Sequence, residues 1–117
     1  MIAPPLSYDE ARQAAHTLAQ RRRIALDELE LAIRSAADKK MEHRKARALA
    51  YIQATGGAAD QRRAQVEDLA SAQEYQRDIA EGMVKVCIER LAACDGERAS
   101  LHRLMEWAMK DPAGMER

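Results

Sequence analysis

The sequence is divided by one short break, Ala54-Thr55-Gly56-Gly57-Ala58, which lies almost at the middle of 117 residues. Glycine weakens a helix interior by about 1 kcal/mol relative to alanine, so two in a row are expected to end a helix and let the chain reverse. Long helix-forming sequence lies on both sides of the break. We therefore predict an all-α fold of two long antiparallel helices, a helical hairpin or coiled coil.

The composition agrees with long helices. Charged residues make up 32% of the chain and aromatic residues 3%, with few glycines and prolines. Such a composition is typical of long helices or coiled coils. Because alanine is the dominant apolar residue, the hydrophobic fraction of 47% overstates the size of the core. Basic and acidic residues number 19 each, so the net charge indicates no class of partner.

Local signals set the expected helix ends. Ser7 and Glu10 have the spacing of a capping box, in which the serine hydroxyl accepts from the Glu10 amide and Glu10 reaches back to the Ser7 amide. Asp111-Pro112 ends the second helix, because the residue before proline avoids the helical region. The predicted segments are a flexible arm (1–6), a single helical-hairpin domain (7–111) made of a helix (7–54), a turn (55–58) and a helix (59–111), and a frayed tail (112–117).

Apolar residues at alternating steps of three and four predict the line along which the helices pack. In the second helix this line comprises Val84, Cys87, Leu91, Cys94, Arg98, Leu101, Met105 and Ala108. In the first helix it comprises Leu18, Ala25 or Leu26, Leu29, Ile33, Ala37, Met41, Ala48 and Ile52. Asp95-Gly96 lies inside the second line. Because the line continues through it, we favour a continuous or mildly kinked helix over a short third helix that begins at Asp95.

Folding the chain about Gly56-Gly57 sets residues 24–33 beside residues 80–89, the two most broadly apolar stretches. Residues 83–88 cover most of a helix circumference, and one partner helix cannot bury all of it. We predict that a second copy covers it, giving a homodimeric four-helix bundle. A monomer with a different protein partner, a three-helix fold and simple exposure remain open. The interface candidates are Ile24, Leu29, Ile33, Met83, Val86, Ile88, Leu104 and Trp107.

Trp107 and Met109 stand near the end of the second helix. One interpretation is an ordinary core at the end of the bundle, with Tyr8 and Ala11 as neighbours. The other is an anchor for a protein partner, since tryptophan and methionine are enriched at binding hot spots.

The stretch nearest the break is basic. Between residues 39 and 63, seven basic residues stand against Glu42 and Asp60. Such a patch can neutralise phosphates, and Tyr51 could stack on a base. The alternative interpretation is a solvated helical face. The nucleic-acid-binding candidates are Lys39, Lys40, Arg44, Lys45, Arg47, Tyr51, Arg62 and Arg63.

A second basic run, Arg21-Arg22-Arg23, precedes acidic residues in the same helix. Asp27, Glu28 and Glu30 follow it at helical spacing. We therefore expect this run to be neutralised along its own helix.

No pattern of an enzyme is present: the sequence has no glycine-rich phosphate loop and no nucleophile elbow, and a thin two-helix layer offers little room for a water-excluding cavity. His16, Cys94, Glu97 and His102 would approach one another in the hairpin and could bind zinc. None of them has the close spacing of a dedicated site. We expect no catalysis, no metal, no cofactor and no small-molecule substrate.

Cys87 and Cys94 are seven residues apart, or about 10.5 Å along a helix. A disulfide needs α-carbons closer than about 7 Å, so both are expected to be free and buried. No apolar run is long enough to span a membrane, and the N-terminus lacks the basic start and apolar core of a signal peptide. We expect a cytoplasmic protein with no membrane partner.

The stretches Lys45-Ala46-Arg47-Ala48-Leu49-Ala50-Tyr51-Ile52, Gly56-Gly57-Ala58-Ala59 and Arg62-Arg63-Ala64 together carry a resemblance. Over roughly residues 40–80 the chain resembles short all-helical proteins of temperate bacteriophages, whose activity is mostly unassigned. The resemblance transfers no catalytic or binding residue. It implies a small phage or prophage protein that acts inside a bacterial cell by binding another molecule.

The leading hypothesis is a small non-enzymatic interaction protein that binds a protein partner, for example a host or defence factor. The alternative is a nucleic-acid-binding accessory of phage DNA metabolism that uses the basic end of the hairpin. A third hypothesis makes the hairpin a rigid spacer within a larger assembly.

Overall fold

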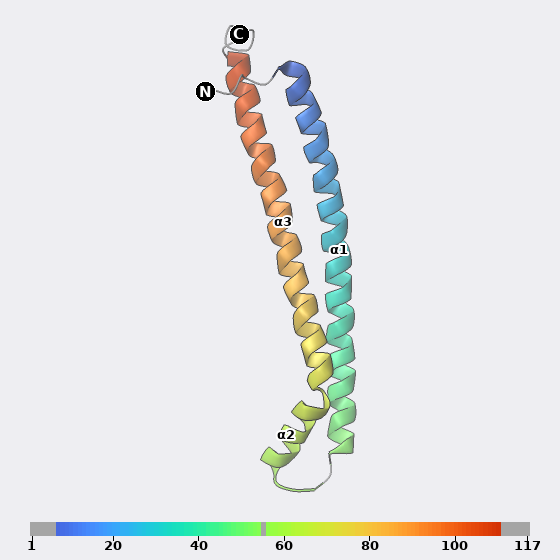
Figure 1. Cartoon of the computed structure of the whole chain (residues 1–117). Helices are drawn as coiled ribbons and strands as arrows, with labels where there is room; N and C mark the ends of the chain where they lie inside the picture. The colour runs from blue at the N-terminus through green and yellow to red at the C-terminus, as the bar shows by residue number, and fades with distance from the viewer. Residues whose placement is uncertain (1–6, 55, 111–117) are drawn as a thin grey trace. The chain divides into compact units, whose positions relative to one another are not determined.

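The computed structural model describes residues 7–54 and 56–110. They form three helices, α1 (Tyr8–Gln53), α2 (Ala59–Leu69) and α3 (Ser71–Lys110), and these residues contain no strand (Figure 1). The prediction of an all-helical chain with two long helices is confirmed. The predicted arm and tail, Thr55 and the predicted helix end at Asp111-Pro112 lie outside the described residues.

The start of α1 follows from its capping residues. The Glu10 amide donates to Ser7 Oγ at 3.2 Å, and the Ala11 amide donates to the Ser7 carbonyl at 2.9 Å. Ser7 therefore satisfies amides that have no partner inside the helix. Asp9 and Glu10 lie in the first turn, where the helix dipole favours negative charge. From here α1 continues for 46 residues.

The turn after α1 depends on its two glycines. Gly56 has φ of 72° and Gly57 has φ of 88°, in the left-handed region that side chains disfavour. The space in which a Gly57 side chain would stand is occupied by Gln61. The glycine pair therefore ends α1 and reverses the chain, as the sequence predicts.

The predicted single second helix is divided at Ala70, a position with neither glycine nor proline nearby. Ala70 has φ of −98° and ψ of 4°, and its amide donates to the Val66 carbonyl at 3.0 Å. Ser71 Oγ donates to the Asp68 carbonyl at 2.8 Å, which offers the backbone an alternative to helical continuation. The short third helix considered at Asp95-Gly96 is wrong, because α3 is continuous there.

The chain divides into two units. The first, here called the terminal unit, comprises Met1–Asp27 and Ile88–Arg117, and the second, the tip unit, comprises Glu28–Cys87. Within each unit a part of α1 runs antiparallel to a part of α3, and the tip unit also contains α2 (Figure 1).

The packing line predicted for the second helix is confirmed in α3. Cys87, Cys94 and Leu101 are buried, and Val84, Leu91 and Met105 are half-buried. Arg98 on the same line is exposed, and the side chain of Ala108 is outside the described part. The line, called the seam below, continues toward the turn at steps of three and four through Ala80, Arg77, Gln73, Ala70 and Val66.

The packing line predicted for the first helix is mostly wrong. Leu18, Ala25 and Leu29 are buried or half-buried, as predicted. The other predicted positions are exposed: Leu26, Ile33, Ala37, Met41, Ala48 and Ile52. The prediction followed the largest apolar side chains, whereas the two helices pack on small ones. The buried and half-buried positions of the α1 seam are Ala11, Ala15, Leu18, Arg22, Ala25, Leu29, Ala32, Ala36, Lys39, His43, Ala46 and Ala50.

The predicted pairing register is also wrong. A fold centred on Gly56-Gly57 would set Arg21 beside Ala92 and His43 beside Ala70. In the terminal unit Arg21 instead forms an ion pair with Glu97 at 2.9 Å. In the tip unit His43 lies 3.2 Å from Arg77. The chain changes direction a second time at Ala70, so the axis of α2 does not continue the axis of α3 (Figure 1). This bend accounts for the shift of the pairing register in the tip unit.

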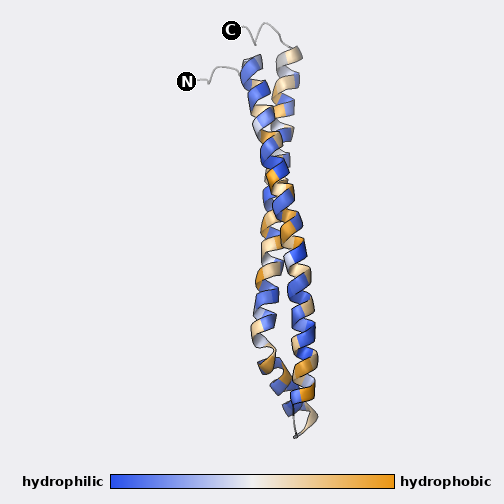
Figure 2. Cartoon of the chain, turned by 90° about the vertical axis from the view of Figure 1, so that its right-hand side faces the viewer, coloured by the Kyte–Doolittle hydropathy of each residue, from blue (hydrophilic) through white to orange (hydrophobic). Residues whose placement is uncertain are grey.

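Hydrophobic residues interleave with hydrophilic ones along both long helices (Figure 2). Within the described residues, no helix is both long and apolar enough to pass through a lipid bilayer. Cys87 and Cys94 are free and buried, as predicted.

Candidate functional site

Large apolar side chains stand one residue before seam positions on α3 of the tip unit. Ile79, Met83 and Val86 precede Ala80, Val84 and Cys87, and all three are exposed, Met83 by 47%. One residue is a rotation of about 100° around a helix. The helix therefore carries two apolar lines about 100° apart, one packed on α1 and one uncovered by this chain.

On α1 of the tip unit, two large apolar residues stand before seam positions, and the positions between them hold Ser35, Asp38, Glu42 and Lys45. Leu31 and Leu49 precede the seam residues Ala32 and Ala50, and Leu31 is 64% exposed. Because α1 and α3 run in opposite directions, positions rotated in the same sense from the two seams face the same side of the pair. This side is called the apolar side and comprises Leu31, Leu49, Ile79, Met83 and Val86.

In the terminal unit, Trp107 and its expected neighbour Tyr8 form no core within the described part of the chain, and Tyr8 is 65% exposed. Trp107 is 73% exposed, and Leu104 and Met109 are exposed as well. Leu104 stands one residue before the half-buried Met105, and Ile24 stands one residue before the buried Ala25. Both side chains are therefore uncovered within this unit.

The remaining interface candidates fall elsewhere. Leu29 is half-buried on the α1 seam and packs within the chain. Ile33 and Ile88 are exposed and follow seam positions, so each is rotated to the opposite side of its helix from the preceding group. The candidates thus do not form one patch.

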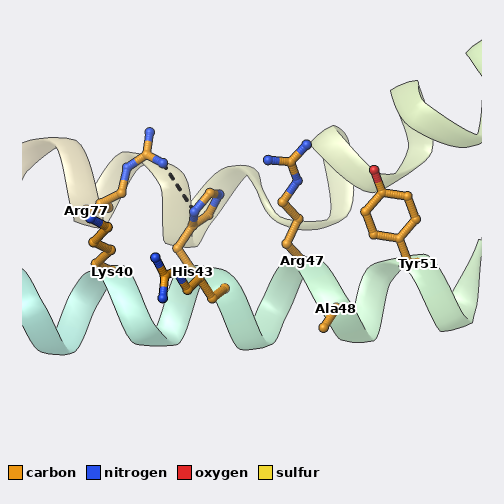
Figure 3. Close-up of a pocket in the computed structure, with 7 residues that line it drawn as sticks. Lys40, His43, Arg47, Ala48, Tyr51 and Arg77 are labelled. Carbon is orange, nitrogen blue, oxygen red and sulfur yellow. Dashed lines mark hydrogen bonds between the residues drawn. The ribbon is translucent and has the colours of Figure 1, made fainter.

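Basic residues of the tip unit gather on the side opposite to the apolar side. An open groove of about 410 Å³ lies there, called the basic groove (Figure 3). Figure 3 shows His43, Arg47 and Tyr51 projecting from α1 toward the side from which Arg77 approaches. The groove is lined by Lys40, His43, Arg44, Arg47, Ala48, Tyr51 and Arg77.

At the floor of the basic groove, Arg77 of α3 and His43 of α1 form a hydrogen bond. Arg77 Nη1 lies 3.2 Å from His43 Nδ1, and His43 is only 8% exposed. An arginine side chain has only donors, so in this hydrogen bond Arg77 donates and the imidazole Nδ1 accepts. His43 therefore fills a buried position and holds Arg77 in place.

Arg77 already has acidic partners. Its Nη2 lies 3.0 Å from Asp78 Oδ1 and 3.7 Å from Glu74 Oε1. The hydrogen bond to Asp78 raises the pKa of Arg77 above its usual value, so the guanidinium stays charged. A hollow of about 250 Å³ adjoins the groove and is lined partly by Glu67 and Glu74. Arg47 and Arg77 line the same hollow, so carboxylates and guanidinium groups meet at this edge of the groove.

Within residues 7–54 and 56–110, Lys40, Arg44 and Arg47 take part in no ion pair, and the basic groove brings them together with Tyr51. The other predicted nucleic-acid candidates lie outside it. Lys39 is on the seam and pairs with Glu42 at 3.3 Å. The remaining three, Lys45, Arg62 and Arg63, are exposed but do not line the groove.

Sequence reasoning missed His43 and Arg77 as residues of this site. The available signal was the heptad line of the second helix, which reaches Arg77 when it is extended back from Val84 through Ala80. On α1 the line through Ala25 and Ala32 reaches Lys39 and His43. Reading the alanines as seam residues would have found both.

The terminal unit has a groove of its own, of about 400 Å³, lined in part by Arg22, Arg23, Arg98 and His102. Arg22 lies 2.7 Å from Asp95, and Arg21 pairs with Glu97. The expectation that this basic run is neutralised along its own helix is therefore wrong for both residues, because the acceptors are on α3. Its lining includes no tyrosine, tryptophan or phenylalanine.

In the described part of the chain, no three histidine, cysteine, aspartate or glutamate side chains come together as metal ligands would. No family model, curated protein or solved structure matches the chain. The resemblance to phage proteins therefore stays a prediction.

Proposed function

We propose that this chain is a non-catalytic interaction protein that works by binding protein helices through its apolar side, and first of all a second copy of itself. The observation that carries the proposal is that small apolar side chains are buried while large apolar side chains are exposed. Among the described residues, alanine supplies five of the nine buried apolar positions, while Leu31, Met83 and Val86 stay exposed.

Covering the apolar side would be favourable. Full burial of a leucine, valine, isoleucine or methionine side chain contributes about 1.5–3 kcal/mol. The five residues of the apolar side are 39% to 64% exposed, so roughly half of this contribution is still to be made. On α3 the exposed Ile79, Met83 and Val86 follow one another along one helical side, and grouped exposed apolar side chains commonly mark a protein interaction site.

A second copy fits the geometry of the apolar side. In a four-helix bundle each helix packs against two neighbours, so it needs two apolar lines roughly at right angles. The lines of α3 in the tip unit are about 100° apart. Two copies related by a twofold axis would bring identical apolar sides together, which is the commonest arrangement of soluble oligomers.

The test is the molar mass in solution, measured by light scattering. We expect the wild-type chain to have twice the mass of one chain. The variant with Met83→Lys and Val86→Lys should have the mass of one chain and keep its helical circular dichroism, because both positions are exposed in the single chain. Ala92→Lys, at an exposed position of the same helix, is the control and should stay dimeric. A wild-type monomer would remove the self-association and leave a different protein as the occupant.

The predicted setting extends this proposal. The resemblance to phage proteins suggests a small phage or prophage protein in the bacterial cytoplasm, with a host or defence factor as the eventual target. In the terminal unit, the exposed Trp107 and Leu104 offer anchors of the kind found at hot spots.

A second candidate function is nucleic-acid binding at the tip unit. The observation in its favour is the basic groove, in which three unpaired cations and an exposed tyrosine line one hollow. Its first test is fluorescence anisotropy with a labelled oligonucleotide at low salt. Absence of any binding there would remove this function and leave the protein-binding proposal untouched.

A further inference from the structure

We infer that the basic groove binds one unpaired strand of nucleic acid, with phosphates along Lys40, Arg44 and Arg47 and a base against Tyr51. The inference rests on the second function proposed above. It narrows that function to one type of strand and to one groove, instead of the whole basic region between residues 39 and 63.

The spacing of the cations suits a backbone that runs along α1. Lys40, Arg44 and Arg47 are four and three residues apart, so they occupy one helical face at intervals of about 6 Å and 4.5 Å along the axis. Because these three have no ion pair within the described part of the chain, their charges are available to phosphates. The row is about 10 Å long, which is enough for roughly three phosphates of a single strand.

Tyr51 lies one turn beyond the last cation and is 54% exposed. Figure 3 shows its ring on the same side of α1 as Arg47. Stacking on a tyrosine needs a base with a free face, and proteins that bind single strands use aromatic side chains in this way. Inside a duplex both faces of a base are covered by its neighbours. The combination of cations and an aromatic ring therefore favours an unpaired strand.

The hollow that adjoins the groove at Arg47 argues against a second strand. Glu67 and Glu74 line the adjoining hollow, and Arg77 is already partnered by Asp78 and Glu74. A second row of phosphates across the groove would meet carboxylates. The charges thus favour one backbone along the row of cations on α1, while the hydrogen-bonded pair of His43 and Arg77 forms the floor.

The experiment is fluorescence anisotropy with a labelled twelve-nucleotide oligo-dT and with a duplex of equal length, across a salt series. We expect the single strand to bind more tightly, with a slope of log affinity against log salt of about −2, as three phosphate contacts imply. Arg44→Glu with Arg47→Glu should abolish measurable binding. Tyr51→Ala should weaken it by at least about fivefold, and Tyr51→Phe should retain it.

The matched control is Arg62→Glu with Arg63→Glu, which makes the same charge change in α2 outside the groove. It should lower affinity far less than the groove pair. All variants change exposed residues, so helical circular dichroism checks that each is folded. If the α2 pair abolishes binding and the groove pair does not, nucleic-acid binding stands and the groove is the wrong site. If Arg23→Glu in the terminal unit abolishes binding and the groove pair does not, the groove is likewise the wrong site. Equal affinity for the duplex overturns the choice of an unpaired strand.

Discussion

At the scale of single residues, the tip unit places polar side chains in a seam that is otherwise built from alanine. His43 and Arg77 bond to each other, and Lys39 reaches Glu42. Buried polar groups are tolerated when their hydrogen-bonding atoms are paired. His43, Arg77 and Lys39 each have such a partner, so the seam accommodates their polar groups.

Gln73 does not meet this condition. Its Oε1 atom is buried and has no hydrogen-bond partner in the described part of the chain. Gln73→Leu removes the unpaired acceptor and adds apolar volume on the seam, so we expect the free energy of unfolding to rise by about 1 kcal/mol. Urea unfolding followed by circular dichroism measures it. Gln20→Leu, at an exposed position of α1 away from the seam, should change stability by less than half that amount, and a loss of stability in Gln73→Leu would contradict the assignment.

At the scale of helices, the small seam residues decide how α1 and α2 pack. Ala50 is almost fully buried, as are Val66 and Ala70 near the end of α2. There is no room for a larger side chain at Ala50, whereas Ala48 on the same helix is exposed. The two alanines therefore distinguish the observed seam from the line predicted from the sequence, which passed through Ala48.

Ala50→Leu should overpack the seam and lower the free energy of unfolding by about 1–3 kcal/mol. Ala48→Leu should be close to neutral, since leucine and alanine have similar helix propensity. Thermal or urea unfolding of the two variants beside the wild type measures the difference. A stable Ala50→Leu with a destabilised Ala48→Leu would restore the line predicted from the sequence.

The glycines allow a second comparison at this scale. Gly57→Ala should lower the free energy of unfolding by about 1 kcal/mol or more, because φ is 88° and the added methyl group meets the Gln61 side chain. Gly96→Ala should raise it by about 0.5–1 kcal/mol, because Gly96 is inside α3 and nothing lies within 4 Å of the added atom. Opposite signs in matched unfolding curves are the expected result, and a neutral Gly57→Ala would show that the turn does not need glycine.

These elements also mark how far the sequence could predict the structure. Glycine pairs and capping boxes act locally, so the break at Gly56-Gly57 and the start at Ser7 were predictable. The α1 seam was not, because alanine carries little apolar signal and exposed Ile33 and Met41 carry more. The bend at Ala70 had only Ser71 as a signal. The basic groove was predictable in its charges, but its floor needed the observed register.

At the scale of the whole molecule, the two sides of the tip unit are compatible with two kinds of binding at once. Residues of the apolar side precede seam residues by one position, and the groove residues on α1 follow seam residues, so the two surfaces lie on opposite sides of the seam. A second copy on the apolar side would therefore leave the groove open. A dimer would carry two grooves, and a long strand that spans both would bind more tightly than a short one through effective concentration.

This gives a prediction that joins the two proposals. The monomeric variant with Met83→Lys and Val86→Lys should bind a short oligo-dT at least as tightly as the wild type, because it alters no groove residue and adds positive charge. For a strand of about sixty nucleotides the wild type should bind at least tenfold more tightly than the variant. Anisotropy with both strand lengths measures the ratio of the two affinities, and Ala92→Lys measures the effect of one added charge. If the ratio of wild-type to variant affinity is the same for both strand lengths, the two grooves do not act on one strand, even if each binds nucleic acid.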